Sequence, residues 1–430
     1  MPLPALAAAP ALAGAEAAQV EPSMPADHTP IPPATRRTVL LLSFATFSSM
    51  VAQRICDPML PELARVFDTG LAQAAQVVSL FAVVYGVAQL VYGPLGDRLG
   101  KFRIVAWATL GCGVGSVLAS LADSLDALVL ARMATGLAAA AVIPLALAWI
   151  GDNVPYEQLQ ETIARVGLGT TLGIGVGQLV GGLLTQTLGW RWAFVFMALL
   201  FGLVGALLLA DWRRQRGSAR ALQPDPAGTV RSSFFAQILP ILTGRWSRVV
   251  LLIAFAEGAA GFGVLAIWAS HLQRGIGMSV SGSGAVVALF GLGGMAYMAS
   301  ARRLIPKLGQ HGLSQAGGIL MGLCALVVAF SPVWPAVVPA SLLAGFGFFM
   351  FHNTMQANAT QMAPGARGTA VSLFSACLFM GQSAGALLAA SLIAWIGSRA
   401  VVTAGGITMI LLGLGFGAAL RRQQRLTTGT

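Results

Sequence analysis

Residues 93–103 read Gly-Pro-Leu-Gly-Asp-Arg-Leu-Gly-Lys-Phe-Arg. This short basic segment separates two apolar runs, at about 72–95 and 103–121. Each run is close to the roughly 20 residues that an α-helix needs to cross a bilayer. The pattern therefore predicts two membrane-spanning helices joined by a short charged loop.

The composition of the whole chain agrees with a lipid environment. Of its 430 residues, 56% are hydrophobic and 10% are charged, and the mean hydropathy is +0.77. Soluble domains carry roughly a quarter charged residues, so this chain has too few charges to cover a water-facing surface. The formal net charge of +11 does not indicate nucleic-acid binding, because the basic residues fall in short clusters between apolar runs.

Twelve apolar runs are long enough to be spans. We expect them at about 38–58, 72–95, 103–121, 125–149, 164–187, 190–210, 247–272, 280–301, 313–331, 336–358, 367–391 and 399–420. Lys and Arg in the expected cytoplasmic loops and ends outnumber those on the other face by about five to one. The predicted fold class is an all-α membrane protein with both termini inside, a multi-pass protein of the bacterial inner membrane.

The chain divides into two similar halves. Gly177-Gln178-x-x-Gly181 in the fifth span returns as Gly381-Gln382-x-x-Gly385 in the eleventh span. A repeat of six helices places the working cavity between the halves, near the middle of the membrane. We expect a disordered cytoplasmic tail at 1–35, six-helix halves at 36–211 and 247–421, a central cytoplasmic loop at 212–246 and a cytoplasmic tail at 422–430.

The loop at 93–103 resembles the conserved cytoplasmic motif Gly-x-Leu-Ala-Asp-Arg-x-Gly-Arg-Lys of the major facilitator superfamily, and the resemblance covers about 36–425. It implies a secondary transporter in which two halves rock about a central site. It also implies a cytoplasmic latch, with Asp97 facing the positive N-terminus of the eleventh span and Lys101 pairing with Asp152. The residues of this latch are Gly93, Asp97, Arg98, Gly100, Lys101, Arg103 and Asp152. The alternative is that the basic residues only retain the loop inside the cell.

The fourth span carries Arg132, between Leu128 and Gly136. This pattern resembles the superfamily motif Leu-x-x-x-Arg-x-x-Gln-Gly, with Thr135 in place of Gln. An arginine within a span is costly, so we expect it to face a cavity or a partner. The alternative is an arginine that extends toward the outer end of the span.

The fifth span carries glycines at a four-residue spacing, followed by one more: Gly169, Gly173, Gly177, Gly181 and Gly182. Small residues on one helix face allow close helix packing. The pattern resembles the motif Gly-x-x-x-Gly-Pro-x-x-Gly-Gly of drug/proton antiporters, with Gln178 in place of proline. Antiport and packing alone both remain open on this pattern.

Two of the few carboxylates in or near the spans are candidates for function. Asp57 shares a helix face with Arg54, and its Asp-x-x-x-Pro spacing is similar to that of the proton-linked aspartate in some twelve-helix multidrug/proton antiporters. That resemblance implies that Asp57 exchanges a proton and that Arg132 senses its charge. Glu257 lies near the middle of the seventh span and is a second candidate, for a proton or for a cationic substrate. The alternatives are a structural Arg54–Asp57 pair and a neutral, hydrogen-bonded Glu257.

Polar residues of other spans are candidates for the wall of a substrate cavity: Tyr85, Gln89, Gln178, His352, Asn353, Gln356 and Gln382. Hydrogen bonding between helices without ligand contact is the alternative for all of them.

The favoured function is proton-coupled efflux of a small amphipathic compound by a monomer, with protons and membrane lipids as its other partners. No Gly-x-x-x-x-Gly-Lys-Ser/Thr loop is present, which argues against an ATP-driven pump. No metal or cofactor is expected, since His and Cys residues are scattered. Proton-coupled uptake or facilitated transport of a sugar or organic metabolite remains the alternative. A membrane-embedded enzyme and a non-transporting sensor are remote ones.

Overall fold

The computed structural model describes residues 32–218 and 234–428, and almost all of them are helical. The helices of the first half are α1 (Pro33–Arg54), α2 (Leu60–Val66), α3 (Leu71–Ala74), α4 (Gln76–Leu99), α5 (Lys101–Ser120), α6 (Leu125–Ala139), α7 (Val142–Asn153), α8 (Tyr156–Thr187) and α9 (Trp190–Ser218). Those of the second half are α10 (Phe234–Thr243), α11 (Arg245–Glu257), α12 (Val264–Ile276), α13 (Val280–Phe330), α14 (Trp334–Gln361) and α15 (Arg367–Thr428). Three short elements complete the described part: the 3₁₀ turns η1 (Asp57–Met59) and η3 (Pro364–Ala366), and the π-helix η2 (Gly258–Gly263).

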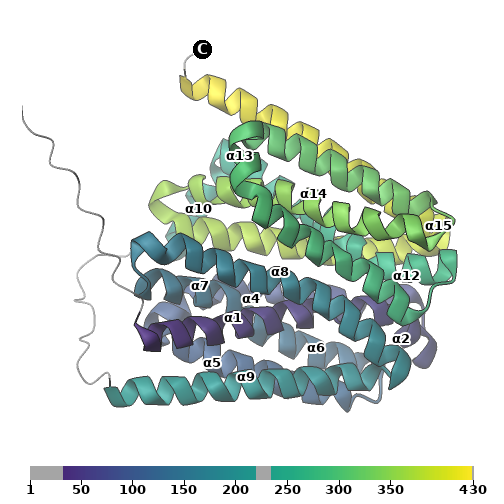
Figure 1. The fold of residues 1–430 in the computed structure, drawn as a ribbon, viewed down its shortest axis with the longest axis horizontal. Helices are drawn as coiled ribbons and strands as arrows, with labels where there is room; N and C mark the ends of the chain where they lie inside the picture. The colour runs from purple at the N-terminus through teal and green to yellow at the C-terminus, as the bar shows by residue number, and fades with distance from the viewer. Residues whose placement is uncertain (1–31, 219–233, 429–430) are drawn as a thin grey trace, which may run out of the picture.

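The long helices lie side by side, and the two halves form two layers of one bundle (Figure 1). The beginning of α1, the end of α9 and the end of α15 lie at the same end of this bundle (Figure 1), which we call the termini end. Ten helical segments of the described part are long and apolar enough to cross a membrane. The protein is therefore an all-α, multi-pass membrane protein.

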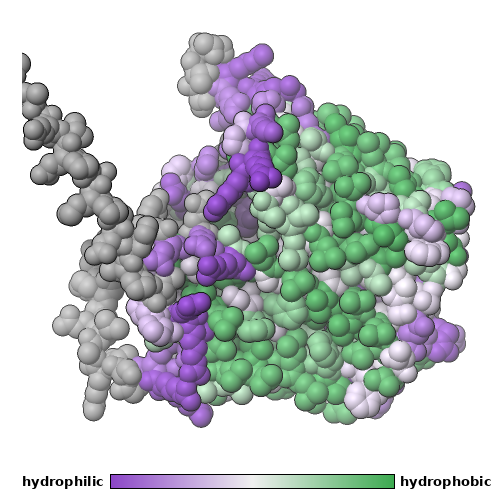
Figure 2. All heavy atoms as spheres, in the orientation of Figure 1, coloured by the Kyte–Doolittle hydropathy of each residue, from purple (hydrophilic) through white to green (hydrophobic). Residues whose placement is uncertain are grey.

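The surface has the distribution of side chains that lipid requires. Figure 2 shows a broad hydrophobic band around the middle of the visible face, with hydrophilic residues concentrated at the termini end. Large apolar side chains are fully open to the surroundings: Leu199 and Leu252 are each 70% exposed, and Trp395 is 86% exposed. Contiguous exposed apolar surface of this kind is unfavourable in water and stable in a bilayer.

The two longest helices are each interrupted by a glycine. Gly309 in α13 has φ 62° and Gly397 in α15 has φ 80°, and both are non-helical. Glycine adopts this left-handed region without steric cost because it has no Cβ. The apolar runs that the sequence predicts at 280–301 and 313–331 therefore lie within one element on the two sides of such a break.

The segment at 93–103 is more helical than a loop. Helix α4 continues to Leu99, α5 begins at Lys101, and the turn is made by Gly100 alone, at φ +92°. The sequence interpretation placed the whole segment in a loop because its charged residues end the apolar run. The backbone remains helical through these charges because helix formation depends on propensity and hydrogen bonding, not on hydropathy.

The two halves repeat one packing arrangement. A Cβ on Gly177 of α8 would lie 2.7 Å from the carbonyl oxygen of Val51 in α1. A Cβ on Gly385 of α15 would lie 2.5 Å from the Cα of Ala259 in η2. In each half the Gly-Gln-x-x-Gly face therefore lies directly against the backbone of that half's first long helix. Contacts this close require that no side chain intervenes.

The halves also contact each other directly. A Cβ on Gly182 of α8 would lie 2.7 Å from the carbonyl oxygen of Val280 in α13. At the end opposite the termini, Gln273 donates to the Pro58 carbonyl at 2.9 Å. The boundary between the halves therefore consists of tight backbone packing together with hydrogen bonds.

Candidate functional site

An ion pair is buried where α1 ends. The Arg54 Nη1 atom lies 3.4 Å from Asp57 Oδ2, and neither side chain is exposed to solvent. Gln178 of α8 donates from Nε2 to the same carboxylate oxygen at 2.7 Å. A buried charge is tolerated only with such partners. The structure thus brings three residues singled out from the sequence into one cluster, and it gives Gln178 a contact that proline could not make.

Arg132 of α6 is buried next to this cluster. Its Nε donates to the Val77 carbonyl at 3.4 Å, and its guanidinium lies 4.1 Å from the centre of the Phe81 ring. Its positive charge is close enough to act on the Asp57 carboxylate. Arg132 is 2% exposed, so it does not extend to water at the end of its helix.

Arg54 also contacts the second half of the protein. Its Nη1 donates to the carbonyl oxygen of Phe262 at 3.3 Å, and its guanidinium lies 4.3 Å from the centre of the Phe262 ring. Phe262 belongs to the π-helix η2. The sequence interpretation missed this residue. The sequence did contain a sign of an irregular helix here, the run Gly-Ala-Ala-Gly-Phe-Gly directly after Glu257. Glycine destabilises the interior of an α-helix.

A second buried pair lies on the other side of η2. Glu257, the last residue of α11, has Oε1 2.9 Å from Nδ1 of His352 in α14. Glu257 is completely buried, and the His352 ring stacks on Phe348 with the ring centres 5.5 Å apart. From the sequence, Glu257 was a proton candidate and His352 a cavity residue. The structure joins them in one ionisable pair.

Several polar atoms in these clusters have no hydrogen-bond partner within the described part of the protein. They are Nη2 of Arg54, Oδ1 of Asp57, Oε2 of Glu257 and both side-chain amide atoms of Gln382. Most buried polar atoms in proteins are hydrogen-bonded. The carboxylate oxygens among these atoms can accept a hydrogen bond, and Nη2 of Arg54 can donate one.

The other predicted cavity residues are not all in this region. Tyr85 is buried, and its hydroxyl lies beside the side chains of Ser49 and Gln89. Asn353 is half-buried and Gln356 is exposed. Of the three α14 residues named as candidates, His352 contacts Glu257 in the buried cluster, and a shared cavity wall for the whole set stays a prediction.

The segment at the α4–α5 turn has one clear interaction. The Lys101 ammonium at the start of α5 pairs with the Asp152 carboxylate near the end of α7. The Arg103 guanidinium lies 5.7 Å from the Trp212 ring centre. Arg98 is exposed, and a Cβ on Gly93 would meet no atom within 4 Å. The side chain of Asp97 lies outside the described residues, so its expected place at the eleventh span stays a prediction.

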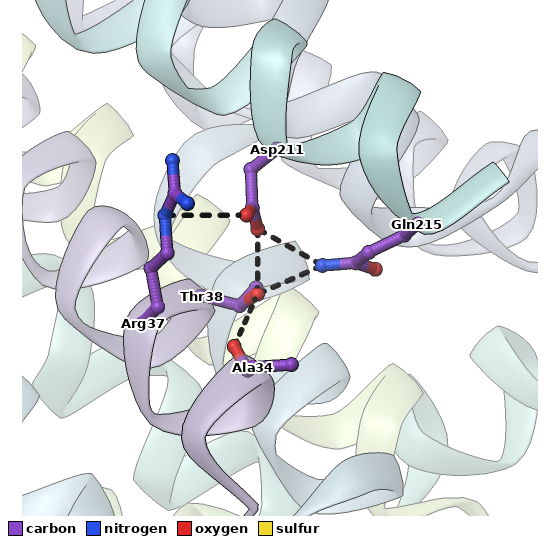
Figure 3. Close-up of polar contacts among 5 residues, drawn as sticks. All are labelled: Ala34, Arg37, Thr38, Asp211 and Gln215. Atoms are coloured by element: carbon purple, nitrogen blue, oxygen red, sulfur yellow. Dashed lines mark hydrogen bonds and ion pairs between the residues drawn. The ribbon is translucent and has the colours of Figure 1, made fainter. Parts of the chain in front are cut away.

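A further polar cluster lies at the termini end and was not foreseen (Figure 3). Thr38 of α1 donates to Asp211 of α9 at 2.7 Å, and Gln215 donates to the same carboxylate oxygen at 2.9 Å. Arg37 approaches the other oxygen at 3.5 Å. The signal in the sequence was an acid at the end of an apolar run. The cluster connects two helices of one half, as expected for a structural role.

The family model described as Major Facilitator Superfamily matches residues 42–370. The chain belongs to the major facilitator superfamily. An MFS-type transporter of Bacillus subtilis, YceJ, is 27% identical over 335 residues, which are 78% of this chain and 84% of that protein.

Two further relatives of this superfamily chain have names that refer to drugs. The puromycin resistance protein pur8 of Streptomyces alboniger is 35% identical over 47% of this chain and 38% of its own length. The multidrug export protein EmrB of Haemophilus influenzae is 29% identical over 40% of this chain and 34% of its own length.

Solved structures agree with the superfamily fold. A bacterial homolog of the human lysosomal transporter Spinster, inward-facing and unoccupied, has a TM-score of 0.70 and 17% identity, over 90% of this chain and 96% of that one. The peptide transporter POT has a TM-score of 0.70 and 16% identity, over 90% and 95% of the two chains. At these identities the likeness shows the fold alone. In this superfamily chain, the Arg54–Phe262 contact lies where the two halves meet.

Proposed function

We propose that the protein is a proton-coupled secondary transporter that exports a small amphipathic compound by alternating access. One observation carries this proposal. The buried Asp57 is held by Arg54, and the same arginine is bonded across the boundary between the halves to Phe262. A titratable group that shares its partner with the opposite half is suited to link protonation to movement of the halves.

The mechanism rests on competition for Arg54. An ionised Asp57 attracts the guanidinium, and the Gln178 bond holds the carboxylate in place. A proton on Asp57 removes the negative charge, so Arg54 interacts less with Asp57 and more with the Phe262 carbonyl. Because the two protonation states favour different positions of Arg54, proton binding shifts the population of bundle conformations. A polar or cationic group of the substrate that competes for the carboxylate releases the proton.

The proposal includes twelve membrane crossings with both termini in the cytoplasm, and the helices and charges support it. The described part has ten apolar segments, and Gly309 and Gly397 each divide one of them, which gives a count of twelve. An even number of crossings leaves both termini on one side, and the excess of Lys and Arg assigns that side to the cytoplasm of a bacterial inner membrane. The Lys101–Asp152 pair then lies at the cytoplasmic end, where it steadies the α4–α5 turn as part of a latch.

The direction of transport is supported by relatives named for puromycin resistance and multidrug export. A different direction is favoured by one residue. Gln178 occupies the place of the antiporter proline and bonds Asp57, so the site also suits proton-coupled uptake of a metabolite. Opposite directions of accumulation separate these two functions.

The test uses everted membrane vesicles that are acidified inside, with a pH-sensitive dye. Puromycin and ethidium are added to wild type, Asp57→Asn and Glu257→Gln, with Glu161→Gln as matched control, because the Glu161 side chain is 62% exposed and lies outside both buried pairs and the latch. We expect at least one compound to release protons from vesicles with wild type and the control, and Asp57→Asn to abolish this release. If a labelled compound equilibrates through the wild-type protein without any proton movement, antiport is wrong.

A further inference from the structure

The two buried pairs are connected by an unbroken series of contacts through η2. Asp57 contacts Arg54 at 3.4 Å, and Arg54 contacts the Phe262 carbonyl at 3.3 Å. The Phe262 and His352 ring centres are 6.3 Å apart, and His352 contacts Glu257 at 2.9 Å. One residue of the second half therefore touches both the arginine of one pair and the histidine of the other.

The π-helix packs closely on α14 and α15. A Cβ on Gly261 would lie 2.7 Å from Cε2 of Phe348, and a Cβ on Gly263 would lie 2.8 Å from the backbone nitrogen of Ala386. The Phe262 ring itself lies 4.5 Å from the Phe348 ring. Short π-helical turns inside α-helices are found frequently at functional sites. Here the turn directs both the carbonyl and the ring of Phe262 toward Arg54.

We propose that η2 couples the two pairs, so that Asp57 and Glu257 bind protons as one linked unit and Phe262 is the positioning residue that transmits the coupling. This inference rests on the proposed proton-coupled function and deepens it. It means that neither carboxylate is the sole proton carrier, because the protonation of each changes the proton affinity of the other.

The physical route is short. When Asp57 changes charge, Arg54 is drawn more or less strongly toward the Phe262 carbonyl, and the Phe262 ring moves with its backbone. That ring packs on Phe348, whose own ring stacks on His352, so the displacement reaches the Glu257–His352 contact. Two ionisable groups that interact in this way titrate as a pair, with pKa values that belong to the pair and not to either residue.

The groups that face each carboxylate are few within the described part of the chain. Arg54 and Arg132 act on Asp57, and Cys56 lies next to it. His352 of α14 faces Glu257, while the neighbouring helix α15 contributes uncharged residues, with Phe374 6.0 Å from the His352 ring. Between the two sets, Phe262 contacts both Arg54 and His352.

The experiment follows protons directly. Purified full-length protein in phospholipid vesicles is titrated with acid, and infrared absorption reports the protonated carboxyl groups. The double variant Asp57→Asn/Glu257→Gln supplies the background to be subtracted, and each single variant leaves one carboxyl of interest. All are prepared in three backgrounds: wild type, Phe262→Leu and Phe349→Leu. The last is the matched control, since the Phe349 ring also contacts His352, at 6.1 Å, while the cation–π partner of Arg54 is Phe262.

In the wild-type and Phe349→Leu backgrounds, we expect removal of one carboxyl to move the titration midpoint of the other by about half a pH unit or more, roughly threefold in proton affinity. In Phe262→Leu the two carboxyls should titrate independently. Phe262→Met, which keeps the volume without the ring, replaces Phe262→Leu if the latter does not fold. Independent midpoints in the wild type, or coupling that persists without the ring, overturn the inference.

The same variants separate this failure from failure of the function. If proton release by substrate still requires Asp57 or Glu257 while the midpoints are independent, only the coupling through η2 is wrong. If neither carboxylate is needed for proton release, the proposed function itself is wrong, whatever the midpoints show.

Discussion

Replacing Gly173 with alanine tests whether the glycine face of α8 exists for close packing against α1. A Cβ at this position would lie 2.5 Å from the carbonyl oxygen of Phe47 and 2.8 Å from the Cβ of Met50. Non-bonded carbon atoms are comfortable at about 3.5–4.0 Å, so the two helices must separate by about 1 Å. Overpacking of this kind costs about 1–3 kcal/mol, and the better helix propensity of alanine offsets about 0.5–1 kcal/mol of it.

The same helix offers a matched control four residues earlier. A Cβ on Gly169 would lie 3.5 Å from the Ser43 carbonyl oxygen, an ordinary contact. Gly169→Ala should therefore be neutral or stabilising by up to about 1 kcal/mol, and Gly173→Ala should be less stable than it by about 2 kcal/mol. Denaturant unfolding of the purified protein in detergent, followed by far-UV circular dichroism, measures this difference. Equal stability of the two variants would refute the packing argument, because the sequence pattern treats both glycines alike.

Other contacts yield further predictions. Lys101→Ala should change the free energy of unfolding by less than about 1 kcal/mol in the same assay, because its partner Asp152 is 56% exposed. A larger loss of stability would show that this ion pair matters for folding. Thr38→Val should lower the free energy of unfolding by about 1–3 kcal/mol, because the buried Asp211 carboxylate loses a hydrogen-bond donor. Thr38→Ser keeps the hydroxyl and should not lower it, and an equal loss in both variants would assign the effect to packing. Gln178→Leu removes the 2.7 Å bond to the cluster at α1 and should lower substrate-driven proton release in vesicles at least tenfold, whereas unchanged release would make the bond irrelevant to coupling.

The sequence alone was sufficient for the architecture. Apolar runs of span length and a bias of Lys and Arg are properties of neighbouring residues, and lipid imposes them on each helix separately. The motif at 93–103 and the Gly-Gln-x-x-Gly repeat are also local, and they led to the superfamily that the family model confirms. The exact ends of helices were harder to predict. Helix α4 shows why, since charged residues end its apolar run several residues before the helix itself ends at Leu99.

The arrangement of the candidate site could be predicted from the sequence only in part. Arg54 and Asp57 are three residues apart, so their pairing follows from helix geometry. The Gln178 contact, the Glu257–His352 pair and the Thr38–Asp211 bond each join distant segments. No spacing in the sequence specifies which side chains meet across helices, so nothing in the sequence indicated that His352 would contact Glu257.

The membrane environment, most of the helices, the superfamily and the candidates Arg54, Asp57, Arg132 and Glu257 could all be predicted from the sequence. The contact of Arg54 with Phe262 across the two halves became visible only in the folded protein. Hydropathy and helix spacing act along the chain, whereas a bond between residues 54 and 262 depends on the rotation and close approach of two packed halves.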